Sequence, residues 1–404
     1  MSRNNFNWPL INDNISENDK KVLANFVLNT NSFTNGPKVK EFEKSWSEWL
    51  GCKYSVMVGS GAAANYITTA IVRELKGQKG EIIVPPIGWV SDISSVINTG
   101  FIPVFVDVDL DTMAISYEQI KAAINENTKA IVLVHALGFN GVNDKLTQLA
   151  KDNNLLLIED CCEAHGATYK SKKVGTLGDM SCFSFYFGHH ITTIEGGMIS
   201  TNDKEIYELA RMFRSHGMTR EASIETHNKY AKPDVNPLFT FAVPGYNMRS
   251  TELNAVLGLE QINRLDNNIR CRCNNLEVWL SNLNPELFFV DFLVEGSSNY
   301  ALPLILNKNN NKMKKVCIAT SRDVGQKCIA WAKDNTPPGF ELTEELESAD
   351  IIISVMYEKI LSSDYINDRV CFNFHPGVLP EYKGSGAFSW VIINQEDKAG
   401  VTLH

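Results

Sequence analysis

The segment from Gly188 to Gly197 contains side chains that move protons, because two adjacent histidines stand in it before a Gly-Gly turn. An imidazole exchanges a proton near neutral pH, so His189 and His190 are candidates for acid–base chemistry. A single histidine is more often a packed or solvated residue, but packing alone explains two adjacent ones less easily. The pattern therefore points to a reaction in which a proton is taken up and returned.

A loop of small residues, Gly59–Asn65, precedes an apolar run of helical character. Such a loop at a helix start presents free backbone N–H groups and the positive end of the helix dipole, which suit a phosphate. Ser184, inside a run of aromatic residues, offers a hydroxyl to the same kind of group. Small residues at a helix start also serve plain packing, so the phosphate hypothesis depends on the residues that accompany the loop.

Two further residues suit a flat heteroaromatic ring. Trp89 follows an apolar run and could stack on such a ring, although a core tryptophan would look the same in sequence. Asp160 ends a very apolar run, where its carboxylate could pair with a protonated pyridine nitrogen and keep a cofactor ring an electron sink. A capping or solvated aspartate is the alternative. With the small-residue loop, these residues predict a site for a phosphorylated pyridine cofactor.

The elements that must position these residues alternate between strand and helix from about residue 15 to 305. Segments predicted as strands are 81–85, 103–108, 130–135 and 155–160, and segments predicted as helices are 116–127 and 143–152. This alternation favours an α/β fold with a mostly parallel sheet between helices, in which ligands bind at the carboxyl ends of the strands. Polar residues stand at those predicted ends: Asp107, Asp109, His135, Glu159 and Asp160.

Composition excludes several classes of protein. Of the 404 residues 44% are apolar and 21% charged, as in globular proteins, and the net charge of −9 argues against a nucleic-acid partner. We expect neither a secretory signal nor a membrane helix, because the N-terminus is polar and no apolar run reaches about 18 residues. Nine cysteines without a disulfide framework predict free thiols and the cytoplasm. Cys161-Cys162 and Cys271-x-Cys273 lack a second pair at zinc spacing, so no metal site is predicted.

A polar stretch rich in asparagine and lysine, residues 307–315, separates two parts of the chain. We therefore predict a first domain over residues 1–306 and a second, partial one over residues 316–404. The second part begins with a strand-like run and contains another buried run at 350–355, which favours a second α/β domain.

Residues from about 6 to 305 resemble the DegT/DnrJ/EryC1/StrS family of pyridoxal-phosphate enzymes that act on nucleotide-linked keto-sugars. The matching segments run in family order: 36–43, 60–65, 103–109, 158–167, 174–179, 183–186, 195–197 and 245–249. The resemblance implies the type I fold of pyridoxal-phosphate aminotransferases, with the small C-terminal domain truncated.

Most members of the family carry, at the position of His189, the lysine that binds the cofactor covalently. The local pattern around His189 is similar to that of the branch that removes the C3 hydroxyl of nucleotide-linked 4-keto-6-deoxy sugars. That branch implies non-covalent pyridoxal or pyridoxamine 5'-phosphate, His189 as the base, and L-glutamate as the amino donor. An imidazole cannot form a Schiff base with an aldehyde, but it can exchange a proton, so the substitution agrees with such a reaction.

The family resemblance also implies roles for other residues. Asp160 should bind the pyridine nitrogen, Glu163 should approach the ring hydroxyl, and Trp89 should stack on the ring. The phosphate should be bound by Gly61, Ala62 and Ser184. Asn247 should reach the phosphate of the neighbouring subunit's cofactor, which implies a homodimer.

The segments 373–386, 389–394 and 400–404 resemble the formyltetrahydrofolate-dependent formyltransferases. Asn373 and His375 alternate along a predicted strand end, where an amide and an imidazole could stabilise an oxyanion and move a proton. The resemblance implies a Rossmann-like fold, catalytic roles for Asn373 and His375, and 10-formyltetrahydrofolate as a possible cofactor. The family's catalytic aspartate is expected downstream of His404 and is absent from this chain.

The leading hypothesis is therefore a 3-dehydratase for a nucleotide-linked sugar, within the pathways that make deoxysugars for surface polysaccharides. A sugar 4-aminotransferase that tolerates histidine shares the fold and is the first alternative. A sugar-amine N-formyltransferase, from the C-terminal part, is the second. A non-catalytic dimeric scaffold is the third, and the retained Asp160, Glu163, Ser184 and Asn247 argue against it.

Overall fold

The computed structural model describes residues 14–307 and, beyond them, 314–320, 340–355, 370–374 and 400–403, with isolated positions between 326 and 336. The described residues belong to two compact units. The first unit contains those of residues 13–281 and 291–300, and the second contains residues 282–290 and those from 301 onward. No helix among the described residues is long and apolar enough to cross a membrane.

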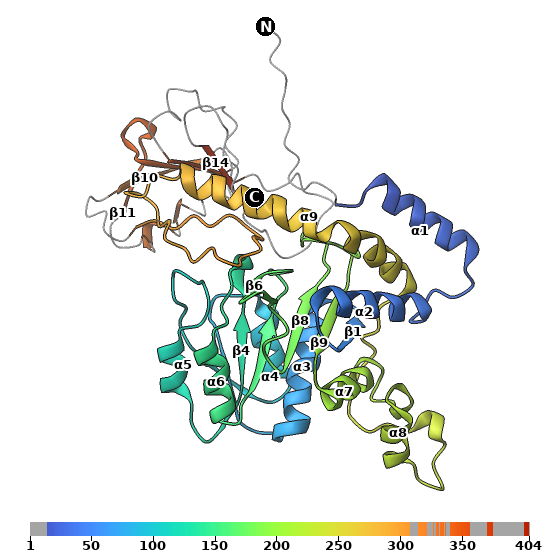
Figure 1. The fold of residues 1–404 in the computed structure, drawn as a ribbon. Coiled ribbons are helices and arrows are strands. Elements are labelled where there is room, and N and C mark those ends of the chain that lie inside the picture. The colour runs from blue at the N-terminus through green and yellow to red at the C-terminus, as the bar shows by residue number, and fades with distance from the viewer. Residues whose placement is uncertain are drawn as a thin grey trace. The chain divides into compact units, whose positions relative to one another are not determined.

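The first unit is built on a seven-stranded sheet in the order β1-β9-β8-β5-β4-β2-β3 (Figure 1). The strands are β1 (Tyr54–Val58), β2 (Glu81–Val84), β3 (Ile102–Phe105), β4 (Thr128–Val134), β5 (Leu156–Asp160), β8 (Met180–Ser184) and β9 (Gly197–Thr201). β9 pairs antiparallel with β1 and β8, and the other pairs are parallel. The predicted mostly parallel sheet is confirmed, with the four predicted strands as β2, β3, β4 and β5.

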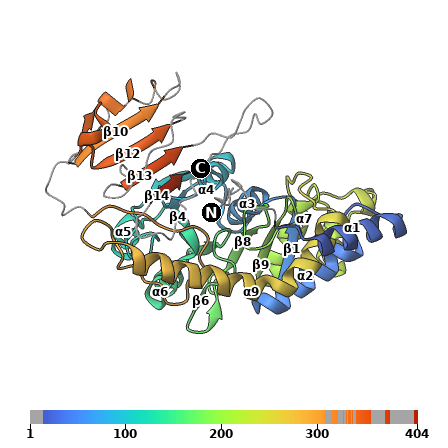
Figure 2. The ribbon, with the colours of Figure 1, turned by 90° about the horizontal axis from the view of Figure 1, so that it is seen from above.

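Helices cover both faces of this sheet. The helices of this unit are α1 (Glu17–Asn29), α2 (Pro37–Leu50), α3 (Gly61–Lys76), α4 (Val90–Asn98), α5 (Tyr117–Ala123), α6 (Asp144–Asp152), α7 (Lys204–Arg214), α8 (Ile224–Tyr230) and α9 (Glu252–Asn282). Figure 2 shows α3, α4 and α7 on one side of the sheet and α2, α5, α6 and α9 on the other. The helices predicted over 116–127 and 143–152 are confirmed as α5 and α6.

Short elements complete the first unit. The two-stranded ribbon β6 (Thr168–Tyr169) and β7 (Lys172–Lys173) is antiparallel, and the 3-10 turns are η1 (Ala136–Gly138), η2 (Thr219–Glu221) and η3 (Pro237–Phe239). The seven cysteines whose side chains the structure describes are all free thiols.

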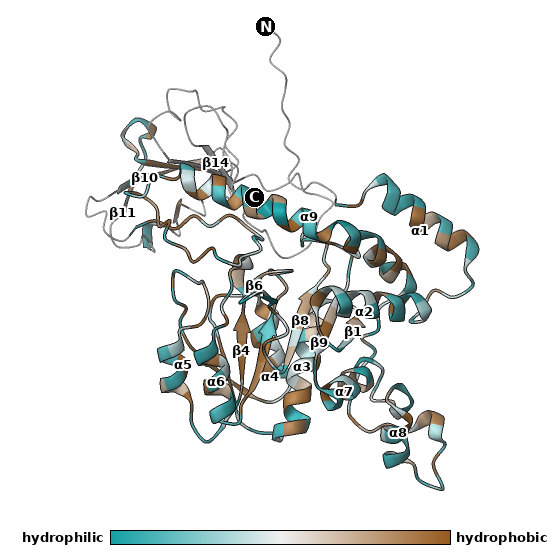
Figure 3. Cartoon of the chain, viewed as in Figure 1, coloured by the Kyte–Doolittle hydropathy of each residue, from teal (hydrophilic) through white to brown (hydrophobic). Residues whose placement is uncertain are grey.

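The central strands are apolar because both of their faces are covered. All five residues of β8 and of β9 are buried, and β4 is apolar along most of its length in Figure 3. A parallel sheet between two helical layers is expected to show such continuous apolar runs rather than an alternating pattern. On the α2 side, Phe42, Trp46, Phe183 and Phe185 are fully buried and pack ring against ring. This aromatic core lies under β8, the strand that leads into the candidate site.

The second unit contains a five-stranded sheet in the order β11-β10-β12-β13-β14. Its strands are β10 (Lys314–Thr320), β11 (Phe340–Thr343), β12 (Ile351–Val355), β13 (Val370–Phe374) and β14 (Gly400–Leu403), with the 3-10 turn η4 (Leu346–Ser348). All four pairings are parallel, which agrees with the predicted Rossmann-like character. Most of the predicted linker, 307–315, lies outside the described residues, and β10 begins at its end.

Candidate active site

Asp160 is the last residue of β5 and lies at the carboxyl edge of the sheet, buried to 5% exposure. One carboxyl oxygen accepts a hydrogen bond from the Asn65 side chain on α3 at 2.9 Å. The other accepts one from the Cys162 backbone N–H, also at 2.9 Å. The carboxyl group is thereby fixed from two neighbouring elements.

The loop predicted to bind a phosphate forms the start of α3, where Ser60 caps the helix by accepting from the Ala63 N–H at 3.1 Å. Gly61, the first helical residue, faces the end of β8: an added Cβ would lie only 2.6 Å from the Ser184 Cβ. The structure thus brings Gly61 and Ser184 together. Ala62, the next residue of the helix, is exposed. Backbone N–H groups at this helix start and the Ser184 hydroxyl form a cradle of the kind that binds a phosphate.

Trp89 is the N-cap residue of α4 and is 48% exposed, which is unusual for so large an aromatic side chain. The sequence alternative of a core tryptophan is therefore wrong. Trp89 comes after the carboxyl end of β2 and Asp160 forms the carboxyl end of β5, at the edge where parallel sheets bind ligands.

Glu163 lies three residues beyond Asp160, and its carboxylate accepts a hydrogen bond from the Leu137 backbone N–H at 2.7 Å. Leu137 adopts a left-handed conformation with φ of 55°, so the turn after β4 is strained at the residue that meets the carboxylate. Enclosure by the protein raises the pKa of Glu163 to about 7, and the nearby Asp160 acts in the same direction. The group can therefore hold or release a proton near neutral pH.

His189 lies in the turn between β8 and β9 and is 9% exposed. Its Nδ1 is buried without a hydrogen-bond partner. Burial lowers the pKa of His189 to about 3, and the positive charge of Arg272 contributes. The imidazole is therefore neutral at physiological pH and able to accept a proton.

His190 is held differently, because its Nε2 lies 3.1 Å from both the Ser298 carbonyl and the Ser298 hydroxyl. It is fully buried, and its ring centroid is 5.0 Å from that of His165. Burial lowers the pKa of both residues well below the ordinary range. The bond to Ser298 makes His190 an anchor for the turn, and His189 is the more exposed of the pair.

Helix α9 fixes the same turn through three amide side chains. Asn254 donates to the Thr193 carbonyl at 2.6 Å, and Asn268 donates to the His190 carbonyl at 3.0 Å. Gln261 accepts from the Thr192 N–H at 3.0 Å. The turn that contains His189 is thus hydrogen-bonded to residues on several turns of α9. These bonds limit the positions that the imidazole can adopt.

Two of the polar residues predicted at strand ends serve the fold instead. His135 Nε2 lies 3.2 Å from Glu159, whose carboxylate also accepts three backbone N–H groups, from Gly175, Leu177 and Gly178. The Cys161 sulfur lies near this pair, close enough for the three residues to share a metal ion. Since His135 and Glu159 already use their polar atoms within the protein, we interpret the cluster as structural.

Asn247 lies on an exposed stretch that begins after α7 and returns to the sheet at β1. The neighbouring Met248 carbonyl accepts from the Gly59 N–H at 2.9 Å, so the stretch passes beside the small-residue loop. Asn247 itself is exposed, and no contact of its side chain with Asp160, Ser184 or His189 occurs in the described structure.

In the second unit, Asn373 lies in β13, in register with Ser354 of β12 and Thr402 of β14. His375, predicted to act with it, lies outside the described residues. The structure therefore does not bear on the pairing of these two side chains.

Several residues at the site were not predicted from sequence: Asn65, Asp92, Leu137, His165, Arg272 and Tyr300. Tyr300 stacks beside His189 with ring centroids 5.1 Å apart, and Arg272 donates to the Tyr300 carbonyl at 2.9 Å. These residues come from distant segments, and no local motif marks them. An aspartate three residues after Trp89, in the first turn of a segment with helical character, was the one available signal.

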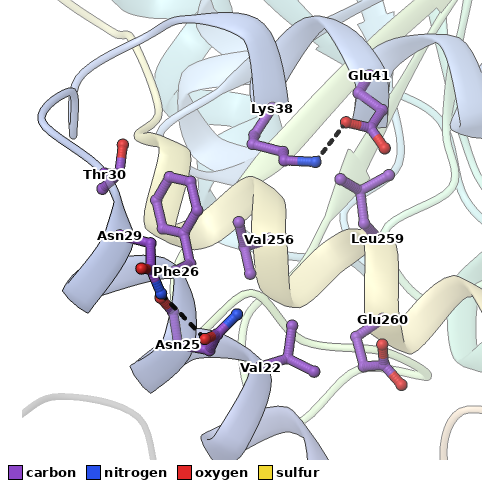
Figure 4. A pocket seen from close by; sticks show the side chains of 10 residues that line it. All are labelled: Val22, Asn25, Phe26, Asn29, Thr30, Lys38, Glu41, Val256, Leu259 and Glu260. Carbon is purple, nitrogen blue, oxygen red and sulfur yellow. Dashed lines mark hydrogen bonds and ion pairs between the residues drawn. The ribbon is translucent and has the colours of Figure 1, made fainter.

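A hollow of about 410 Å³ lies apart from these residues, between α1, α2 and the start of α9 (Figure 4). Phe26, Val256 and Leu259 form apolar parts of its wall, and Lys38 and Glu41 form an ion pair at 2.7 Å on its rim. None of the predicted site residues lines it.

Comparison with known proteins agrees with the geometry. Residues 14–326 match the DegT/DnrJ/EryC1/StrS aminotransferase family, and residues 301–404 match the formyl transferase family. The chain is 33% identical over 329 residues to the GDP-4-keto-6-deoxy-D-mannose 3-dehydratase of Escherichia coli O55:H7, which covers 80% of this chain and 84% of that protein. It is 29% identical over 364 residues to the dTDP-4-dehydro-2,6-dideoxy-D-glucose 3-dehydratase of Saccharopolyspora spinosa, covering 84% and 79%.

Solved structures show the same likeness. An E. coli GDP-4-keto-6-deoxy-D-mannose-3-dehydratase with bound hydrated PLP has a TM-score of 0.70 at 28% identity, covering 85% of this chain and 92% of that one. A GDP-4-keto-6-deoxymannose-3-dehydratase with a trapped PLP-glutamate geminal diamine has a TM-score of 0.67 at the same identity and coverage.

Proposed function

Because the chain belongs to the DegT/DnrJ/EryC1/StrS aminotransferase family, we propose that it is a vitamin-B6-dependent dehydratase. Its reaction removes the C3 hydroxyl of a nucleotide-linked 4-keto-6-deoxy sugar, in the synthesis of a deoxysugar for a surface polysaccharide. The observation that carries this proposal is a neutral imidazole, His189, in the turn between β8 and β9. The segment 185–196 contains no lysine, so this turn offers no amine for a covalent cofactor bond.

The residues present fit pyridoxamine or pyridoxal 5'-phosphate. Gly61 lies so close to Ser184 that a side chain at position 61 would not fit. The backbone N–H groups at this helix start therefore remain accessible, as a phosphate site requires. The exposed indole of Trp89 suits the face of the ring, and the buried carboxyl of Asp160 suits its pyridine nitrogen. Glu163 is the group for the ring hydroxyl. When bound, the cofactor supplies an amine for the C4 ketone and a ring that accepts electrons.

His189 performs the proton transfers in this proposal. Its Nδ1 is buried without a hydrogen-bond partner, and we therefore assign both proton transfers to Nε2. Burial makes the protonated imidazole a strong acid, because the pKa of His189 lies at about 3. The same Nε2 can therefore return a proton to the C3 hydroxyl as it leaves. The anchoring of the turn by Asn254, Gln261 and Asn268 holds this nitrogen in place for both transfers.

The amino donor and the oligomeric state follow from the same proposal. L-glutamate would restore the amine form of the cofactor, and the related structure that holds PLP with glutamate supports this choice. A homodimer would bring Asn247 to the partner's cofactor phosphate. The side chains of Ile224, Phe239 and Tyr246, on the same stretch as Asn247, are apolar and exposed. Such a surface supports a subunit interface at this stretch.

The test is the mass of the sugar product. The purified protein is incubated with pyridoxamine 5'-phosphate, L-glutamate and a GDP- or CDP-linked 4-keto-6-deoxy sugar. Loss of the C3 oxygen supports the dehydratase, gain of an amine supports the 4-aminotransferase, and an unchanged sugar supports the scaffold. The variant His189→Asn should lose dehydration by about 100-fold or more, as expected on removal of a general base, while cofactor binding remains.

Borohydride reduction is a second test of the same site. The cofactor should wash out of the wild-type protein after reduction, because no side chain in the turn can bond to it. Permanent attachment of the cofactor to the polypeptide would refute the assignment of His189.

The second unit supports a second candidate activity, formyl transfer to a sugar amine. The match of residues 301–404 to the formyl transferase family and the all-parallel sheet favour it. Asn373 and His375 would be its catalytic residues and 10-formyltetrahydrofolate its cofactor. Incubation with that cofactor and a nucleotide-linked amino sugar, followed by mass measurement, should show a formylated product. An unchanged amino sugar would refute this activity.

A further inference from the structure

A second carboxyl group stands beside Asp160. Asp92, in the first turn of α4, is 4% exposed and turns inward, whereas Trp89 at the start of the same helix is exposed. The side-chain nitrogen of Asn65 lies 2.6 Å from an oxygen of Asp92 and 2.9 Å from an oxygen of Asp160. One amide therefore bridges two buried carboxyl groups.

The two carboxyl groups and the Asn65 amide have more acceptor atoms than hydrogens to share, unless one carboxyl group carries a proton. The Asn65 nitrogen has two hydrogens but three acceptors, since the Ser91 hydroxyl also lies 3.2 Å away. The second oxygen of Asp92 and the Asn65 side-chain oxygen are buried without a hydrogen-bond partner. Neither Asp92 nor Asp160 forms an ion pair with a basic side chain in the part of the chain that the structure describes. Two adjacent buried carboxylates without a cation would both lose hydration and repel each other.

We propose that Asp92 is a positioning residue that stays protonated and donates a hydrogen bond to Asp160, so that the pair presents one negative charge to the pyridine nitrogen. This inference rests on the role of Asp160 in the proposed function. It adds that Asp92, which has no part in the proposed function, is protonated and holds Asp160 in position. Because Trp89 and Asp92 share one turn of α4, the helix links the residue that stacks on the ring to the acid beneath the pyridine nitrogen.

The surroundings favour the protonated form of Asp92. Burial raises the pKa of Asp92 well above its usual range, and the negative charge of Asp160 adds to the effect. Glu163, from the loop after β5, acts in the same direction. The thiols that face the pair, Cys162 and Cys182, have pKa values raised by burial and by the carboxyl groups, so they remain neutral.

The proton can be observed directly in the protein without cofactor. The infrared difference spectrum of wild type minus Asp92→Asn should show the carbonyl stretch of one protonated carboxylic acid, because the band of any other protonated carboxyl group, such as Glu163 with its pKa of about 7, cancels between the two proteins. Asp152→Asn, an exposed aspartate at the end of α6, is the control and should keep it. In Asp160→Asn the band should disappear at a pH at least about one unit lower, because removal of a like charge lowers the pKa of its neighbour. A difference spectrum without this band, or a band whose titration is the same in Asp160→Asn, would overturn the proposal.

Cofactor binding supplies the independent readout. Asp92→Ala should weaken binding of pyridoxamine 5'-phosphate by about tenfold, the loss expected for one hydrogen bond to a charged group. Asp92→Asn should recover most of that loss, because an amide N–H can replace the acid as donor to Asp160. Equal weakening in both variants would mean that the negative charge of Asp92 matters, and would refute the protonated form.

The infrared and activity measurements can fail independently of each other. The infrared band is measured without cofactor or substrate, so it can be present even if no sugar is dehydrated. Asp92→Ser, which keeps a hydroxyl donor in a smaller side chain, replaces Asp92→Asn if that variant does not fold, and the same band should be lost. Circular dichroism of each variant establishes that the fold is retained.

Discussion

Glu163 should make the stability of the protein fall as the pH rises through neutrality. Its pKa is raised from an ordinary 4.5 to about 7 because the carboxyl group is enclosed by the protein. Between these two values the folded protein holds the proton that the unfolded chain has already released. The stabilisation is therefore complete below pH 4.5 and is lost as the pH rises through 7. The difference between the two pKa values corresponds to about 3 kcal/mol of unfolding free energy.

The variant Glu163→Gln isolates this contribution. Glutamine keeps an oxygen that can accept from the Leu137 N–H but cannot ionise. The unfolding free energy of the variant minus that of the wild type should therefore increase by about 2–3 kcal/mol between pH 4.5 and pH 8.5. Urea unfolding at a series of pH values measures it. Glu118→Gln, an exposed glutamate on α5, is the control and should show no such trend. A difference for Glu163→Gln that stays constant over this range would refute the argument.

Three further predictions concern the same site. Burial holds the pKa of His165 well below 6.5, so the unfolded chain binds a proton there that the folded protein does not. The wild type should lose about 1.4 kcal/mol per pH unit below pH 6 from this group, and acid titration of His165→Phe should show a slope smaller by that amount. Trp89→Ala should weaken cofactor binding about tenfold in a fluorescence titration, and Trp89→Phe should weaken it less, because stacking requires an aromatic face. Gly61→Ala places a Cβ 2.6 Å from the Ser184 Cβ, so it should lower the unfolding free energy by about 1–3 kcal/mol and weaken phosphate binding, as calorimetry can measure.

The sheet could be predicted from sequence because its central strands are buried on both faces. Such strands are nearly continuous apolar runs, and β2, β4 and β5 lie within a few residues of the predicted runs. The edge strand β3 is partly exposed but is apolar as well, so it was also found. Helix α6 could be placed because its residues follow a helical period, and in the structure the Asn143 side chain caps it by accepting from the Leu146 N–H at 3.0 Å. The order of the strands could not be predicted, since β9 inserts between β1 and β8 only through pairing across the whole unit.

The site was predictable where one local segment carries it. The start of α3, the end of β5 and the turn with His189 each have a local pattern, and each places its residue at the carboxyl edge of the sheet or in the turn next to it. Contacts between segments far apart in the sequence could not be predicted. The bond from His190 to Ser298 joins residues 108 positions apart, and the bridge from Asn65 to Asp160 joins residues 95 apart. Residue types alone also could not show that His135 and Glu159 bond to each other and that Glu159 accepts three backbone N–H groups.

A histidine with a pKa of about 3 is a weak base, and the reaction must compensate for that weakness. Part of the compensation is electrostatic. The low pKa is set by burial and by Arg272, and the negative charges of a bound phosphorylated cofactor and nucleotide-linked sugar would raise the affinity of the imidazole for a proton. The other part lies in the second transfer, since an imidazolium that is unstable in this site gives its proton readily to a departing hydroxyl. A lysine would perform that step poorly, because its ammonium group holds a proton more tightly than an imidazolium does. Its amine would also form a Schiff base with the cofactor aldehyde. In the proposed function, the burial that weakens His189 as a base would therefore strengthen it as the acid for loss of water, and this asymmetry would favour removal of a hydroxyl over exchange of an amine.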